Sequence, residues 1–115
     1  MVKLAAVPSA LAIVFGSGLF CGPCLAQSAA VSEGHQLAQK TCAVCHVIVP
    51  NGPGSWTDAP SFESIANRPT ITQQWLASFI QNPQHPHMLF EEYTRAQASA
   101  IAAYIMSLHH TSANQ

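Results

Sequence analysis

Two cysteines and a histidine in the first half of the chain have the residue types and the spacing to hold a metal-containing cofactor. They form the run Cys42-Ala43-Val44-Cys45-His46. On one helical turn, positions i, i+3 and i+4 share a face, so Cys42, Cys45 and His46 point the same way. The two thiols can form thioethers with the vinyl groups of a porphyrin while the imidazole reaches its iron. Cys-x-x-Cys-His is the attachment signature of c-type haem, and we expect one covalently attached haem c here.

Two other interpretations of the same cysteines stay open. Neighbouring thiols of exported proteins are often joined, so Cys42 and Cys45 could form a structural disulfide. The two thiols could instead bind zinc together with His85 and His87. Neither arrangement requires a histidine directly after the second cysteine, and the sequence therefore favours haem.

On its other face, the iron of such a haem has a methionine ligand, a second histidine ligand or an open position. Met106 lies within a strong helical pattern and is more simply a packing residue. Met88 lies in a loop between two predicted helices, and a loop can curl over the far face of a haem. We therefore expect His46 and Met88 to be the two axial ligands, a pair that raises the reduction potential. The loop histidines His85 and His87 are the rival ligands.

The elements around these residues are predicted to be helices joined by loops rich in proline and glycine. No segment after the N-terminal region shows the alternation typical of a strand, so the predicted fold class is all-α. Ser32 is the expected N-cap of a helix that runs to about Thr41 and delivers the Cys-x-x-Cys-His turn. A loop follows over residues 50–60, and a short helical turn over residues 62–66.

Two capping boxes predict the starts of the remaining helices. Thr70 and Gln73 form the first box, and Thr94 and Gln97 form the second. The helix that begins at the second box carries one apolar stripe at helical spacing, formed by Ile101, Tyr104, Ile105 and Leu108.

The N-terminal region has the layout of a secretory signal peptide. Lys3 precedes an uncharged, mostly apolar run over residues 4–20, and Cys24 and Ala26 then occupy the small positions of a cleavage site. We expect cleavage after Ala26 and export to the periplasm.

This cleavage makes residues 1–26 the signal peptide and residues 27–115 the domain. Cleavage after Ala30 is an alternative, and so is an uncleaved membrane anchor, since the apolar run is nearly long enough to span a bilayer. A membrane is an expected partner only in that uncleaved case.

Length and charge limit the remaining possibilities. A chain of 115 residues forms one domain at most, and only 8% of its residues are charged. Its basic residues are too few and too scattered for a phosphate-binding stripe, so we expect no nucleic-acid partner. Cleavage after Ala26 removes one of the four basic residues, Lys3, and none of the five acidic ones, which leaves a formal charge of −2.

Taken together, these features resemble the class I c-type cytochromes, particularly the small bacterial mono-haem type, over residues 32–109. The resemblance implies a fold of three to four helices wrapped around one haem, with the N- and C-terminal helices crossing. It also implies an exported one-electron carrier that cycles between Fe(II) and Fe(III), and not an enzyme. A redox protein donor and acceptor would be its partners, and the expected state is a monomer.

The resemblance also assigns roles to particular residues. Gly34 matches the small residue where the terminal helices touch, and Tyr104 matches the aromatic residue that packs onto it. Pro60 matches the proline whose carbonyl accepts a hydrogen bond from the axial histidine, so that it would orient His46. The sequence departs from the family pattern at Leu89, where proline often follows the axial methionine. It also lacks the ring of lysines that many members have around the haem edge.

Two other functions remain open from the sequence. One is a haem subunit of a larger periplasmic oxidoreductase. The other is a haem enzyme or sensor with an open iron site, which the early position of the attachment motif disfavours.

Overall fold

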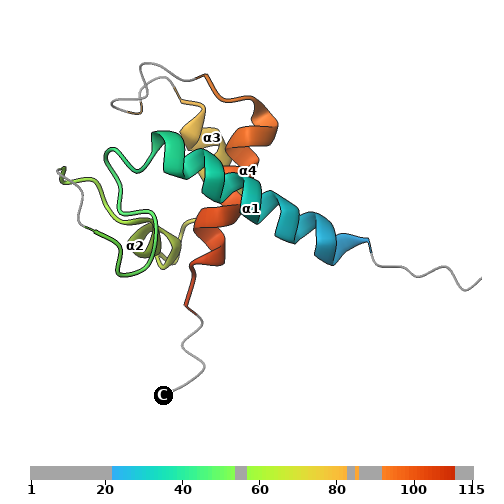
Figure 1. Cartoon of the computed structure of the whole chain (residues 1–115), viewed down its shortest axis with the longest axis horizontal. Helices are drawn as coiled ribbons and strands as arrows, with labels where there is room; N and C mark the ends of the chain where they lie inside the picture. The colour runs from blue at the N-terminus through green and yellow to red at the C-terminus, as the bar shows by residue number, and fades with distance from the viewer. Residues whose placement is uncertain (1–21, 54–56, 83–84, 86–91, 111–115) are drawn as a thin grey trace, which may run out of the picture.

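Four α-helices make up the fold of the residues that the structure describes. The structure is a computed structural model, which describes residues 22–53, 57–82, 85 and 92–110. The helices follow in the order α1 (Pro23–Thr41), α2 (Phe62–Ala66), α3 (Gln73–Ile80) and α4 (Arg95–Ser107) (Figure 1). No strand is present within those residues. The all-α expectation is confirmed.

Helix α4 is the centre of the packing, because it contacts each of the other three helices. Helix α1 crosses it, as Figure 1 shows. The crossing is close at Gly34, where an added Cβ would lie 2.0 Å from the carbonyl oxygen of Ala100 and 2.9 Å from the Cβ of Tyr104. Only a residue without a side chain fits there unless the backbone moves. The crossing of the terminal helices, with Gly34 at the contact, is confirmed.

Burial on α4 extends around the helix and is not limited to one stripe. Three of the four predicted stripe residues are buried, and Leu108 is partly buried. Four alanines are buried as well, because α1 covers one side of α4 while α2 and α3 contact it elsewhere. These alanines are Ala98, Ala100, Ala102 and Ala103.

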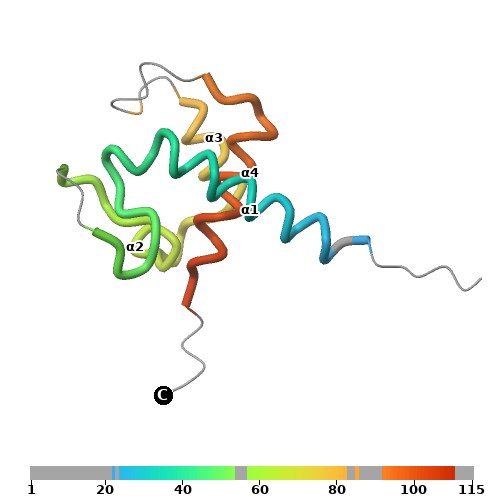
Figure 2. The backbone as a smooth tube through the Cα atoms, in the orientation of Figure 1, coloured from blue at the N-terminus to red at the C-terminus, as the bar shows by residue number. Residues whose placement is uncertain are grey.

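The start of α1 differs from the prediction. The helix begins at Pro23, and Ser32 lies inside it and is not its N-cap. Proline suits a first turn, where its missing N–H has no partner to lose, and the residues before Ser32 are mostly good helix formers. Residues 24–29 are exposed, and this end of the helix extends away from the others (Figure 2). None of the helices described is long and apolar enough to span a membrane.

The caps of α3 and α4 gave one wrong prediction and one confirmed prediction. Thr72, and not Thr70, is the N-cap of α3, and its hydroxyl accepts a hydrogen bond from the N–H of Trp75 at 3.1 Å. The predicted box at α4 is complete. The Gln97 N–H donates to the hydroxyl of Thr94, and the Thr94 N–H donates to the Gln97 side chain.

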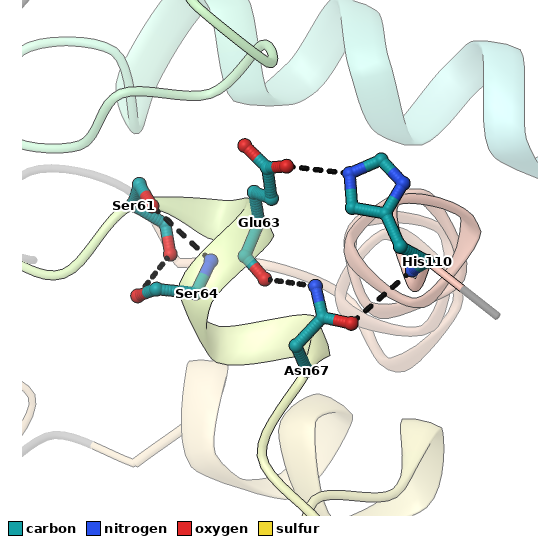
Figure 3. Close-up of polar contacts among 5 residues, drawn as sticks. All are labelled: Ser61, Glu63, Ser64, Asn67 and His110. Atoms are coloured by element: carbon teal, nitrogen blue, oxygen red, sulfur yellow. Dashed lines mark hydrogen bonds and ion pairs between the residues drawn. The ribbon is translucent and has the colours of Figure 1, made fainter. Parts of the chain in front are cut away.

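Helix α2 is only five residues long and is held by polar contacts at both ends (Figure 3). At its start, the Ser64 N–H donates to the Ser61 hydroxyl at 3.1 Å. At its other end, Asn67 accepts from the His110 N–H at 3.2 Å. Glu63, in the first turn, lies 2.5 Å from the His110 ring. The chain beyond α4 is thereby fastened to α2, whose N-cap Ser61 directly follows Pro60.

Candidate functional site

A single helical turn at the end of α1 presents the two cysteines and the histidine. The Cys42 N–H donates to the carbonyl of Ala38 at 2.9 Å, so the turn continues directly from the helix. The N–H groups of Cys45 and His46 both donate to the carbonyl of Cys42, at 3.0 and 2.9 Å. Cys42, Cys45 and His46 consequently line the same cavity.

The two thiols of this turn are free in the structure, so the disulfide interpretation is wrong for it. Burial raises the pKa of the Cys42 thiol above its ordinary value of 9.0; the hydroxyl of Thr41 opposes this shift and Cys45 adds to it. Cys42 is therefore a neutral thiol at neutral pH. For the zinc interpretation, His87 lies outside the described residues. Within them, no group of three or more His, Cys, Asp or Glu side chains is placed to hold a metal ion.

A hydrogen bond fixes the proton of His46. Its Nδ1 lies 2.7 Å from the carbonyl oxygen of Pro60. A carbonyl oxygen only accepts, so Nδ1–H is the donor and the lone pair of the neutral ring is on Nε2. The ring also packs against Phe62, with the ring centroids 5.4 Å apart. Nε2 is thus the nitrogen left to bind a metal.

The bond from His46 is one of three that connect residues 45–47 to the segment that leads into α2 and includes its first residue. The Thr57 hydroxyl donates to the carbonyl of Cys45 at 2.6 Å. The Phe62 N–H donates to the carbonyl of Val47 at 3.0 Å. Three consecutive residues, 45–47, are therefore bonded to one continuous segment, residues 57–62, which we call the strap.

The cavity in front of this turn has a volume of about 640 Å³, within the range of small-molecule and cofactor sites. Its walls come from the turn, the strap, α2, α3, α4 and the connections between them, and most of its lining side chains are apolar. The apolar members are Ala59, Pro60, Phe62, Ile65, Ile71, Trp75, Leu76, Phe79, Ile80, Ile101 and Ile105. Arg68 adds a guanidinium to the lining, and Asp58 adds a carboxylate.

The family model for cytochrome c matches residues 31–109 of the chain. The chain belongs to the cytochrome c family. Cytochrome c-552 of Bradyrhizobium diazoefficiens is a relative of this cytochrome, 41% identical over 83 residues that cover 72% of this chain and 79% of that protein. No solved structure gave a significant match.

Members of this family are electron carriers that hold haem c covalently and act with redox partners, so this cytochrome is an electron carrier with haem c as its cofactor. The residues present fit that group. The cavity offers mostly apolar walls to a flat macrocycle, with two thiols and an imidazole on one side. The guanidinium of Arg68 suits a carboxylate of the kind that haem carries.

The structure brings together four of the five residues predicted for the site. Cys42, Cys45, His46 and Pro60 line the cavity. The fifth, Met88, lies outside the described residues. Both flanks of its segment are described, however. His85 lines the cavity, and the Tyr93 hydroxyl is hydrogen-bonded to Thr41, the residue before Cys42.

Sequence reasoning missed two members of the site. Thr57 belongs to the predicted loop over residues 50–60, and no local pattern marks its contact with the carbonyl of Cys45. Arg68 could have been found, because it is one of only four basic residues in the chain.

Proposed function

We propose that this cytochrome is an exported, monomeric, mono-haem carrier of single electrons, attached to its haem at Cys42 and Cys45 and ligated by His46 and Met88. The observation that carries the proposal is the position of Cys42, Cys45 and His46 on one wall of an apolar cavity, with Nε2 of His46 left to bind. When bound, the haem iron takes up and releases one electron between Fe(III) and Fe(II).

The protein's own residues supply the attachment, the orientation and the exclusion of water. The thiols of Cys42 and Cys45 are free to add to the vinyl groups. The Pro60 carbonyl holds the His46 ring in one orientation and one tautomer, which increases the basicity of Nε2. Phe62, buried beside that ring, restricts water from this side.

Support for Met88 comes from the position of its neighbours along the chain. Met88 follows His85 by three residues, and that length of chain spans at most about 11 Å. His85 is itself part of the cavity lining. A methionine ligand favours the ferrous state and raises the reduction potential.

Support for export and cleavage after Ala26 comes from the N-terminal sequence and from burial. The charged start, apolar run and small residues at positions 24 and 26 form a signal peptide pattern. Residues 24–29 are exposed, so a cut after Ala26 removes none of the core residues that the structure describes. The domain would then be residues 27–115, in the periplasm, exchanging electrons with one donor and one acceptor protein.

The first test is the mass of the purified protein, produced in a host with a haem-attachment system. We expect a chain that begins at Gln27 with one haem bound covalently, and no covalent haem in the Cys42→Ala/Cys45→Ala variant. A wild type without covalent haem would overturn the proposal.

The second test concerns the methionine ligand. Met88→Ala should lower the reduction potential and remove the sulfur-to-iron charge-transfer band of the ferric protein. Met106→Leu is the matched control, since Met106 is partly buried against the core on α4, and both properties should stay unchanged. If the potential and the band change in Met106→Leu and stay unchanged in Met88→Ala, Met88 is not the ligand.

A further inference from the structure

The imidazole of His85 faces that of His46 across the haem cavity. Their ring centroids are 6.2 Å apart, and their planes differ by 24°. Both residues line the cavity. His46 belongs to the attachment turn, whereas His85 follows α3, so two separate parts of the chain bring these rings together.

The separation of the two rings is the one that a shared metal ion requires. Imidazole nitrogens bind a first-row metal at about 2.0 Å, which, with the distance from nitrogen to ring centre added on both sides, separates two ligating ring centroids by roughly 6 Å. The observed 6.2 Å agrees with that value. The distance between the two rings thus matches that of two imidazoles that bind one iron between them.

Contacts to α3 and the residues just after it hold His85 in this position. Its backbone N–H donates to the carbonyl of Asn82 at 3.0 Å. Its ring packs edge-on against Phe79, with centroids 5.1 Å apart and planes at 87°. Phe79 in turn stacks on Trp75 at 5.0 Å. The placement of His85 therefore has support that does not depend on Met88.

His85 and Met88 differ in the oxidation state that they favour. The thioether of Met88 is soft and favours ferrous iron, whereas a neutral imidazole is a stronger donor to ferric iron. With His46 on one axial position, only one further axial position remains. Two side chains three residues apart would compete for it.

We propose that His85 is a reserve axial ligand, which binds the ferric iron opposite His46 whenever Met88 is not bound. The inference rests on the proposed function. In the exchange the Fe–S bond breaks and an Fe–N bond forms, with the nitrogen supplying the electron pair and the sulfur keeping its own. The iron stays ferric. The result is a haem that remains six-coordinate, and closed to small ligands, when its methionine dissociates.

The test uses ferric holoprotein in which covalent haem has first been verified by mass. Met88→Ala should give the electron paramagnetic resonance spectrum of low-spin iron with two imidazole ligands. Met88→Ala/His85→Ala should lose that spectrum. Imidazole added in solution must displace His85 in the single variant, so its apparent affinity there should be about tenfold weaker than in the double variant if His85 occupies nine sites in ten.

Two further variants separate ligation from folding and from the neighbouring histidine. Met88→Ala/His85→Phe keeps an aromatic ring against Phe79 but has no nitrogen, and it should behave like the His85→Ala double variant. Met88→Ala/His87→Ala should keep the two-imidazole spectrum.

Three outcomes would overturn the reserve role. The first is a high-spin Met88→Ala protein that binds added imidazole as tightly as the double variants. The second is loss of the low-spin spectrum on removal of His87 in place of His85. The third is a wild type that already has two imidazole ligands, which would also overturn the assignment of Met88 as an axial ligand. Absence of covalent haem in the wild type would instead overturn the proposed function, so the two failures are distinguishable.

Discussion

Tyr104 connects the last helix to the segment that follows the attachment turn. Its side chain is buried, and its hydroxyl donates to the carbonyl of Ile48 at 2.8 Å. Its ring packs on His35, with the centroids 4.7 Å apart. The expected aromatic residue at the helix crossing therefore also holds the chain just beyond His46.

Tyr104→Phe keeps the ring and removes this hydrogen bond. We expect the free energy of unfolding to fall by about 1 kcal/mol, because the buried Ile48 carbonyl loses its partner. For a domain of this size that is a decrease in Tm of roughly 4–8 °C. Thermal unfolding of the holoprotein at neutral pH measures it. An unchanged Tm would show that the bond contributes nothing to stability.

The difference in stability between the wild type and Tyr104→Phe should depend on pH. Burial raises the pKa of Tyr104 above its ordinary value of 10.0. The folded state thus binds this proton more tightly than the unfolded state, so its contribution is complete below pH 10 and is lost as pH rises through the raised pKa. Denaturant unfolding between pH 9 and pH 11 should show the gap between wild type and Tyr104→Phe shrinking as pH rises. A constant gap would contradict this.

At the residue scale, the sequence was sufficient where a short motif holds the whole geometry. Cys42, Cys45 and His46 are placed by one helical turn, so their spacing alone predicts a common face. The contact of Thr57 with Cys45 depends instead on the path of a loop, which no local pattern determines. Pro60 came from the family resemblance, since a backbone carbonyl acceptor leaves no mark on the sequence.

At the scale of elements, the crossing of α1 and α4 depends on a missing side chain. Gly34→Ala would place a methyl group 2.0 Å from the backbone oxygen of Ala100, and backbone cannot rotate away as a side chain can. We expect a loss of about 3 kcal/mol in the free energy of unfolding, the upper part of the range for overpacked cores. Ser32→Ala, exposed on the same helix, is the control and should change it by less than about 0.5 kcal/mol. Equal effects of the two substitutions would contradict this crossing.

The start of α3 offers a sharper comparison between two threonines. Thr72→Ala removes the acceptor for the N–H of Trp75 and should cost about 1 kcal/mol. Thr70 lies before the cap and is exposed, so Thr70→Ala should lower the free energy of unfolding by less than about 0.5 kcal/mol. Chemical denaturation of both holoproteins tests this, and the reverse order would support the cap that the sequence alone predicted.

The misplaced cap has a physical reason. The spacing of Thr70 and Gln73 satisfies a capping box, whereas Thr72 has Trp75 at the corresponding position. Ile71 favours Thr72 as the N-cap, because it packs against the buried core that includes Leu76. An apolar residue before the cap that packs near the fourth helical position is a hydrophobic staple. The staple is visible in the sequence, but its weight against the capping box depends on where the core lies.

At the scale of the whole molecule, the cofactor cavity takes the place of much of a conventional core. Chains of this size bury a small fraction of their surface and are marginally stable without additional support. Here seven of the twelve buried apolar residues described lie on α4, and several of the twelve, such as Phe62, Leu76 and Ile101, also form cavity walls. A covalently held haem would therefore be a structural component as well as the redox centre.

The N-terminal limit of the folded unit follows from burial along α1. Its first turns are exposed, with Leu25 63% accessible, whereas Val31 packs against the core and Gly34 is buried at the crossing. Tolerance to truncation should follow this burial and not the helix boundary. Holoprotein that starts at Gln27 should therefore match protein that starts at Gly22 to within about 0.5 kcal/mol in the free energy of unfolding.

Protein that starts at His35 is the matched comparison, because it loses both Val31 and the Gly34 contact. It should unfold at a clearly lower denaturant concentration. The three midpoints decide between two arrangements of the whole molecule, because equal midpoints for the Gly22 and Gln27 starts place the first turns of α1 outside the cooperative unit. A large loss already at the Gln27 start would mean that those turns stabilise the fold, and cleavage after Ala26 would then remove part of the structure that holds the haem.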